Sequence, residues 1–196
     1  MQHVNNVTYV RYAESARVNW ATNFGLHIDP ENGEKWKELM TPKTIGLILK
    51  SIKVDYKFPM TYPDKVSVFH KLRHAPFPSP SHDASSFLLD VLILSETEQR
   101  PAARCFENLV VYDYRKGKKV DIPPFMVRAF ENLWEEQETN RRAVMKRISQ
   151  MESELERLEQ ETWNRAGAIE DMGWSNAGQE KVDVYPMRSE ERAVGI

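Results

Sequence analysis

The sequence contains a single cysteine, Cys105, among 196 residues, so no disulfide can form within the chain. Cys105 lies inside an apolar run, which favours a small buried side chain over a reactive nucleophile. The absence of disulfides indicates a reducing compartment. We therefore expect an intracellular protein, cytoplasmic or mitochondrial, with any targeting segment lying before Met1.

Long hydrophobic runs are also missing, and neither sign of charge dominates. The longest apolar run, residues 87–94, is interrupted by Asp90 and is shorter than the ~18 residues that a membrane-spanning helix needs. Lysine and arginine number 27, aspartate and glutamate 29, and the net charge is -2, so there is no basic field for nucleic acid. We expect no membrane span and no nucleic acid partner, which leaves a small molecule or another protein.

Two common catalytic signatures are absent as well. The sequence has no glycine-rich phosphate loop and no Gly-x-Ser-x-Gly segment, which disfavours a serine-hydrolase mechanism. His70 and His74 alternate on one face of a predicted strand, but no cysteine, aspartate or glutamate stands beside them at metal-ligand spacing. We therefore predict no metal and no other cofactor.

The periodicity predicts one helix followed by four strands. Apolar or small residues recur on one face over residues 7–24, with Asn5 or Asn6 available as N-cap, and Gly25 is expected to end this helix. Residues 26–40 are expected to form a loop with a short helical turn around Trp36. Alternation then predicts the strands listed here: residues 45–58 with a bulge near Ser51, 66–74, 87–94 and 103–114. The order is typical of the α+β class.

Two segments of this sheet region have further features. Residues 75–84 contain three prolines and are expected to form an exposed excursion that cannot pair with a strand. The nearly continuous apolar run 87–94 predicts a strand that is buried on both faces. Within it, Asp90 is either a buried functional carboxylate or a residue at the edge of the core.

The pattern changes after residue 124. Apolar residues at heptad-compatible spacing predict a long amphipathic helix over residues 125–165: Phe130, Trp134, Val144, Ile148, Met151, Leu155 and Leu158. Gln137 and Arg141 interrupt this seam, which favours packing on the domain or on a partner copy over a free coiled coil. Residues 166–196 are polar and aperiodic, and we expect a mostly disordered tail with Trp174 and Tyr185 as weak anchors. The predicted domains are thus residues 1–124, 125–165 and 166–196.

The first seventeen residues resemble a known family. His3-Val4-Asn5-Asn6 leads into a helix with Tyr9 and then Glu14-x-x-Arg17. This segment resembles the hot-dog thioesterase superfamily, particularly its 4-hydroxybenzoyl-CoA thioesterase-like group, the fungal relatives of that group, and the plant acyl-ACP thioesterases. The likeness continues in the strand from Asp64-Lys65-Val66 and over residues 103–123. It implies a hot-dog fold, in which an antiparallel sheet wraps a central helix, here with a long C-terminal helix added.

The resemblance implies catalytic residues at the start of this helix. A helix N-terminus offers free N–H groups and a positive dipole end, which can polarise a thioester carbonyl. His3, Asn5, Asn6 and Glu14 are the catalytic candidates, His3 to orient or protonate and the asparagines to cap the helix and shape the carbonyl pocket. The family's usual acidic residue would lie about four residues before His3, and with the first strand it would precede Met1.

Each candidate has a simpler structural alternative. His3 is equally well explained as a solvated terminal residue, and Asn6 as a helix cap. Glu14 is most simply an ion-pair partner of Arg17. Three further residues are candidates for substrate binding: Tyr9, which otherwise belongs to the core or a dimer contact, and Lys71 and Arg73, which would bind coenzyme A phosphates or remain solvated.

The resemblance predicts an acyl-CoA or acyl-ACP thioesterase of lipid metabolism that acts by water attack at the helix N-terminus. In this family two protomers build the site together, so a homodimer or higher homo-oligomer is expected. The alternative is a non-catalytic hot-dog module, in which the C-terminal helix is a scaffold or docks a partner as a coiled coil. A hydratase or dehydratase on the same fold ranks last.

Overall fold

The computed structural model describes residues 3–75, 83–164 and 166–167. It divides into two compact units, Met1–Met145 and Lys146–Ile196. Residues 76–82, which make up most of the predicted proline-rich excursion, lie outside the described residues. The tail from residue 168, including both expected anchors Trp174 and Tyr185, lies outside them too.

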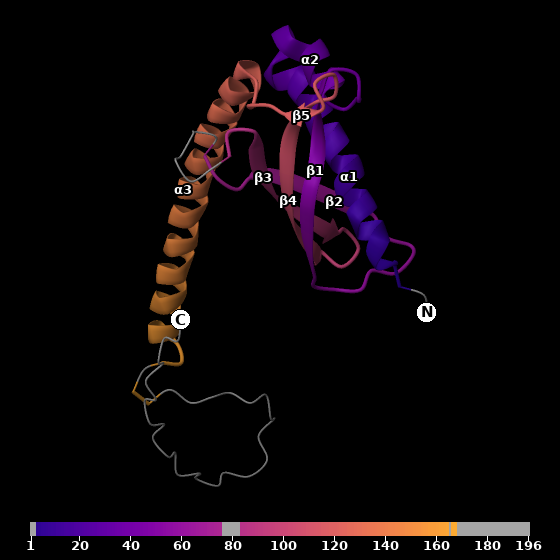
Figure 1. Ribbon diagram of the computed structural model, residues 1–196. Coiled ribbons are helices and arrows are strands. Elements are labelled where there is room, and N and C mark those ends of the chain that lie inside the picture. The colour runs from indigo at the N-terminus through magenta and orange to yellow at the C-terminus, as the bar shows by residue number, and fades with distance from the viewer. Residues whose placement is uncertain (1–2, 76–82, 165, 168–196) are drawn as a thin grey trace. The chain divides into compact units, whose positions relative to one another are not determined.

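The predicted first helix is confirmed as α1, Asn6–Asn23. Asn5 is the N-cap, because its side-chain oxygen accepts a hydrogen bond from the Val7 backbone N–H at 2.9 Å. The buried residues of α1 are spaced four apart and form one stripe, made of Tyr9, Ala13, Arg17 and Ala21. This stripe packs α1 along the sheet (Figure 1).

Gly25 does not end α1 in the way the sequence suggested. The chain continues from α1 into a π-helical turn, Phe24–Ile28, that contains Gly25 without a left-handed conformation. Gly25 is instead required by a close approach, because a Cβ there would lie 3.0 Å from the carbonyl oxygen of Gly33. A short 3-10 turn, Pro30–Asn32, and α2, Gly33–Glu38, follow. The helical turn predicted around Trp36 is α2, and the Trp36 side chain is completely buried.

The sheet is antiparallel with the strand order β1-β4-β3-β2, and β5 pairs with the outer end of β4 (Figure 1). Its strands are β1 (Ile45–Tyr56), β2 (Val66–Leu72), β3 (Ser86–Ser95), β4 (Arg100–Asp113) and β5 (Lys118–Lys119). The bulge near Ser51 is confirmed by a register shift between Leu49 and Ser51. β2 ends two residues earlier than predicted, so Arg73 and His74 lie beyond it.

The prediction that residues 87–94 form a strand buried on both faces is wrong. Residues of β3 alternate between buried and half-buried positions, so one face enters the core and the other lies outward. Leucines on the outward face made the run look continuous in sequence. On the inward face of β4, Cys105 is fully buried, and burial raises the pKa of its thiol to about 11, which confirms a packing residue.

The long C-terminal helix is confirmed as α3, Pro124–Glu161. Its first turns bury Met126, Ala129 and Phe130. Phe130 lies in an aromatic cluster with ring centroids 4.9 Å from Phe87 and 5.9 Å from Phe24. The start of α3 therefore completes the core of the first unit. Within the described part of the chain, no helix is long and apolar enough to cross a membrane.

Gln137, which interrupts the heptad seam of α3, binds the open edge of the sheet. Its side-chain oxygen accepts from the Leu72 N–H at 3.0 Å, and its amide nitrogen donates to the Leu72 carbonyl at 3.1 Å. The two bonds satisfy backbone groups that face away from β3. A polar residue at this seam position therefore holds α3 to β2.

We predict that Gln137→Leu lowers the free energy of unfolding by about 1–3 kcal/mol, because two backbone groups of Leu72 lose their partners. Urea unfolding of the full chain measures this change. Asn140→Leu, at an exposed position of the same helix, is the matched control and is expected to change stability by less than about 0.5 kcal/mol. Equal effects of the two substitutions would show that the Gln137 bonds contribute nothing specific.

Candidate functional site

The start of α1 is held against the segment that follows β1. The Val4 backbone N–H donates to the Met60 carbonyl at 2.8 Å, and His3 forms an antiparallel bridge with Thr61. These contacts give the His3–Asn5 segment an extended path that turns into the helix at Asn5. Far-separated parts of the sequence therefore meet at the helix N-terminus.

Two tyrosines fix this junction. The Tyr9 hydroxyl, which is buried, donates to the Phe58 carbonyl at 3.3 Å and accepts from the Met60 N–H at 3.0 Å. The Tyr56 hydroxyl donates to the Asn6 carbonyl at 3.2 Å, and the Tyr9 and Tyr56 rings meet edge to face. Both hydrogen bonds of the Tyr9 hydroxyl are thus made within the protein. These contacts support Tyr9 as a core residue and not as a substrate-binding residue.

The helix N-terminus presents unneutralised positive charge to solvent. The first turn of α1 contains no acidic residue. The Asn6 backbone N–H has no hydrogen-bond acceptor among the described residues, and His3, Asn5 and Asn6 are all exposed beside it. Such a group is able to donate a hydrogen bond to a bound carbonyl or carboxylate oxygen.

The other predicted site residues lie elsewhere. Glu14 is exposed on α1, and the expected ion pair with Arg17 is wrong, because Arg17 turns inward to a residue of β4. Lys71 and Arg73 lie beside Asp90 on the outward face of the sheet, with nitrogen-to-oxygen distances of 3.9 Å and 3.7 Å. They are therefore not brought together with His3, and Asp90 is a half-buried partner of these cations.

A buried ionic cluster lies between α1 and the sheet. The Arg17 guanidinium donates to Oε1 of Glu107, on β4, at 2.5 Å. Nε2 of His70, on β2, lies 3.9 Å from Oε2 of the same carboxylate. The side chains of His70 and Glu107 are 1% and 0% exposed, and neither of these two facing atoms has a hydrogen-bond partner among the described residues.

Burial decides the ionisation of this cluster. Desolvation raises the pKa of the Glu107 carboxyl, and the Arg17 charge opposes that shift. Desolvation, with the Arg17 charge second, lowers the pKa of His70 to about 4, so the imidazole is neutral at pH 7. The Arg17–Glu107 contact thus lies beside a neutral histidine.

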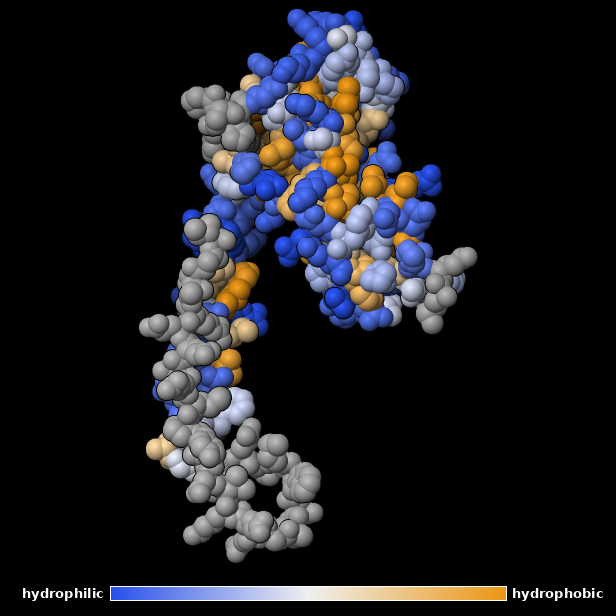
Figure 2. Space-filling view, turned by 60° about the horizontal axis from the view of Figure 1, so that its bottom comes forward, coloured by the Kyte–Doolittle hydropathy of each residue, from blue (hydrophilic) through white to orange (hydrophobic). Residues whose placement is uncertain are grey.

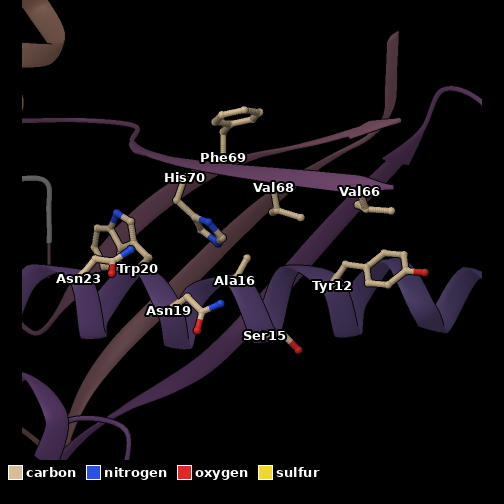
Figure 3. Close-up of a pocket in the computed structure, with 10 residues that line it drawn as sticks. All are labelled: Tyr12, Ser15, Ala16, Asn19, Trp20, Asn23, Val66, Val68, Phe69 and His70. Atoms are coloured by element: carbon tan, nitrogen blue, oxygen red, sulfur yellow. The ribbon is translucent and has the colours of Figure 1, made fainter. Parts of the chain in front are cut away.

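A groove of about 450 Å³ runs between α1 and β2 above this cluster. The His70 ring points from β2 toward α1 within it (Figure 3). Its walls are formed by α1 residues Tyr12, Ser15, Ala16, Asn19, Trp20 and Asn23 and by β2 residues Val66, Val68, Phe69 and His70. The groove begins near Tyr12, on the turn after Tyr9, and follows the edge of β2 that no described strand covers.

Glu107 was missed by the sequence argument, although a signal was present. Cys105, Leu109 and Val111 stand at alternate positions of their strand and so share one face, and Glu107 has the same parity. A charged residue in a core-facing position needs a buried partner, and Arg17 is the inward-facing charge on the helix. Once the helix is placed on the sheet, these two inward-facing charges of opposite sign are expected to form an ion pair.

Acidification is expected to weaken the fold through His70. Because its folded pKa, about 4, lies below the ordinary value of 6.5, the unfolded chain binds the proton more tightly. The resulting stability is complete above pH 6.5 and is lost as the pH falls toward 4, by up to ~1.4 kcal/mol per pH unit. Glu107 acts in the opposite sense, since its raised pKa removes stability as the pH rises.

The measurement is urea unfolding of the chain and of His70→Phe over this pH range. The variant is expected to lose less stability on acidification than the parent protein. His27→Phe, at an exposed position, is the control and should follow the parent. Parallel curves for the parent and His70→Phe would show that His70 is not the responsible group.

No set of three or more histidine, cysteine, aspartate or glutamate side chains in the described ranges could hold a metal ion. The candidate site consists of the N-terminus of α1, the groove between α1 and β2, and the buried ionic cluster of Arg17, Glu107 and His70. These elements lie in the first unit, where an antiparallel sheet packs along α1.

Comparison with known proteins identifies this architecture. The family model of the thioesterase-like superfamily matches residues 1–130. The chain belongs to this superfamily. No curated protein matches the sequence. The resemblance of the first seventeen residues is thereby confirmed at the level of the family.

Solved structures confirm the hot-dog fold. The probable thioesterase YbaW from Escherichia coli is 22% identical, with a TM-score of 0.50, and the match covers 67% of this chain and 86% of that one. The hypothetical protein SAV2348 from Staphylococcus aureus, in complex with CoA, is 10% identical, with a TM-score of 0.53 and coverage of 69% and 75%. At these identities the likeness shows the fold alone.

Proposed function

We propose that this protein hydrolyses an acyl thioester, with acyl-CoA as the substrate, at the N-terminus of α1. The observation on which this rests is the exposed Asn6 N–H at a helix start without acidic residues, held in place by Tyr9 and Tyr56. Membership of the thioesterase-like superfamily supports the reaction class. The CoA complex of SAV2348, which has the same fold, supports CoA over a carrier protein.

In the proposed reaction the thioester carbonyl oxygen accepts a hydrogen bond from the Asn6 N–H. Water attacks the carbonyl carbon, and negative charge develops on that oxygen, where the helix end stabilises it. The carbon–sulfur bond then breaks, giving a carboxylic acid and the CoA thiol. His3 is exposed beside this position, where it orients the water or protonates the leaving sulfur.

The other predicted residues have secondary roles in this proposal. Glu14 is the carboxylate candidate for activating the water, and it is exposed two turns along α1. The acyl group lies in the groove that begins near Tyr12, whose apolar walls include Val66 and Trp20. Lys71 and Arg73 lie on the outward face and would contact CoA phosphates only at a site shared between protomers.

A homodimer is part of the proposed function. β1 is a twelve-residue strand that pairs with β4 alone within the described chain, so its other edge is able to pair with a second copy. An isologous contact of this kind would place two sheets side by side. The mass of the full chain in solution tests this arrangement.

The test of the activity is release of free CoA from a panel of acyl-CoAs of different chain lengths, measured with the full chain. Turnover is expected with at least one substrate, and His3→Ala should lower kcat by about 10²–10⁴-fold if His3 transfers the proton. His27→Ala, at an exposed position in the turn after α1, is the matched control and should retain the parent rate. Equal rates for His3→Ala and the parent would remove His3 from the mechanism.

A non-catalytic hot-dog module is the second candidate. One observation favours it: no carboxylate among the described residues contacts His3, so no base is in place to pair with it. This candidate predicts that acyl-CoA binds without release of CoA. Binding measured by calorimetry, combined with the absence of turnover across the panel, would select it over the hydrolase.

A further inference from the structure

The second half of α3 has an apolar stripe that is exposed among the described residues. Ile148, Met151, Leu155 and Leu158 repeat at steps of three and four residues and are 39%, 58%, 57% and 44% exposed. Figure 2 shows apolar residues along one side of this part of the helix, between charged ones. Val144, four residues before Ile148 in the same helix, is 56% exposed and continues the spacing. We call these five residues the α3 seam.

The spacing of the α3 seam is that of a helix-to-helix contact. Apolar residues at alternating steps of three and four face one side of a helix and fit between the residues of a second helix. The earlier interruption at Gln137 does not belong to this contact, because Gln137 binds the backbone of Leu72. The seam therefore begins after the part of α3 that packs on the sheet.

The charges of this part of α3 argue against a membrane as the occupant. Residues 144–158, which span the α3 seam, contain three glutamates and three basic residues. Helices that lie on anionic lipid surfaces have a polar face rich in lysine and arginine. The polar face beside the α3 seam has no such excess of basic residues, which leaves another helix as the occupant.

Charges that flank the α3 seam indicate a second copy in antiparallel orientation. In a parallel pair, Arg147 faces the partner copy's Glu152, but Glu154 faces the partner copy's Glu159, so one contact attracts and the other repels. In an antiparallel pair centred between residues 149 and 150, Arg147 of each copy lies on the same flank as Glu154 of the other, two residues from the position directly opposite. Both central contacts then attract, and Ile148 meets Met151 while Val144 meets Leu155.

We propose that two copies of this chain associate through the α3 seam, with their helices antiparallel. The contact is short, about 18 Å for the twelve residues 144–155 at 1.5 Å per residue, so a dissociation constant on the order of micromolar is expected. This contact is separate from the β1 edge and does not depend on thioesterase activity.

Sedimentation of the full chain over a range of concentrations tests the association. The parent protein is expected to show a concentration-dependent doubling of mass that Leu155→Asp abolishes, with at least a tenfold rise in the dissociation constant. Ser153→Asp adds the same charge on the opposite side of α3 and should leave the association intact. Far-UV circular dichroism verifies that both variants keep their helix content.

Charge exchange tests the orientation. Arg147→Glu is expected to weaken association by about three- to tenfold, because two attractive contacts become repulsive. Adding Glu154→Arg to it should restore association in the antiparallel pair, whereas restoration by Glu152→Arg instead would overturn the orientation. Equal masses for the parent and Leu155→Asp at all concentrations, or binding of the parent to phosphatidylserine vesicles in place of self-association, would overturn the proposal.

Discussion

Replacing Glu107 by leucine is expected to lower the free energy of unfolding by about 3–5 kcal/mol. The substitution leaves the Arg17 guanidinium, whose side chain is 11% exposed, without the carboxylate that it contacts at 2.5 Å. A buried charge without a partner loses its hydration and gains nothing in return. Most domains have a stability of only about 5–15 kcal/mol, so the loss is a large fraction of the total. Urea unfolding at pH 7 measures it.

The double variant Arg17→Met/Glu107→Leu separates the missing charge partner from a general packing defect. Replacing both members of a buried ion pair by apolar residues of similar size is often neutral or stabilising, so the double variant is expected to recover most of the loss. Glu14→Leu, an exposed carboxylate on the same helix, should change stability by less than about 0.5 kcal/mol. A double variant as unstable as Glu107→Leu would refute the ion-pair explanation.

Replacing Asn6 by proline is expected to reduce kcat for acyl-CoA hydrolysis by about 10²–10³-fold while leaving the fold intact. Proline removes the Asn6 N–H, the group that we propose donates to the carbonyl oxygen. It fits the first position of a helix, where its fixed φ matches the helix and the lost N–H has no partner within the helix. Asn5, with φ -63° and ψ 142°, already has the extended conformation that a residue before proline requires.

Asn6→Ala is the matched control, because it removes the side chain and keeps the backbone N–H. We expect it to retain most of the parent kcat, and thermal unfolding should show both variants folded. A rate for Asn6→Pro equal to that of Asn6→Ala would exclude the Asn6 N–H as the donor. Loss of activity in both variants alike would instead assign the effect to the asparagine side chain.

The first half of α3 shows why a polar residue interrupts its heptad pattern. In sequence, Gln137 looks like a polar interruption that weakens a coiled coil. In the structure its amide forms both hydrogen bonds that Leu72 offers at the edge of β2, so α3 packs on the sheet at this position. The apolar seam after it is therefore a separate contact surface, and this separation motivates the self-association proposal.

The local pattern of the sequence was sufficient to predict the elements. Helix α1, the bulge near Ser51 and the long helix α3 all depend on residue type and on spacing over a few neighbours, whereas the choice of Asn5 over Asn6 as the N-cap came from the structure. The family was also predictable, because His3-Val4-Asn5-Asn6 is a short continuous segment at the start of α1. Local information decides such features, since the atoms involved are close along the chain.

Tertiary structure alone decided which charges meet. Arg17 and Glu107 are ninety residues apart, and the contact between them exists because α1 packs along the sheet in one particular register. The same packing turned Arg17 away from Glu14, placed His70 beside a buried carboxylate, and put Lys71 and Arg73 on the opposite face of the sheet from the helix. Spacing in sequence cannot determine these contacts, because they are set by the free energy of burying the whole sheet against the helix.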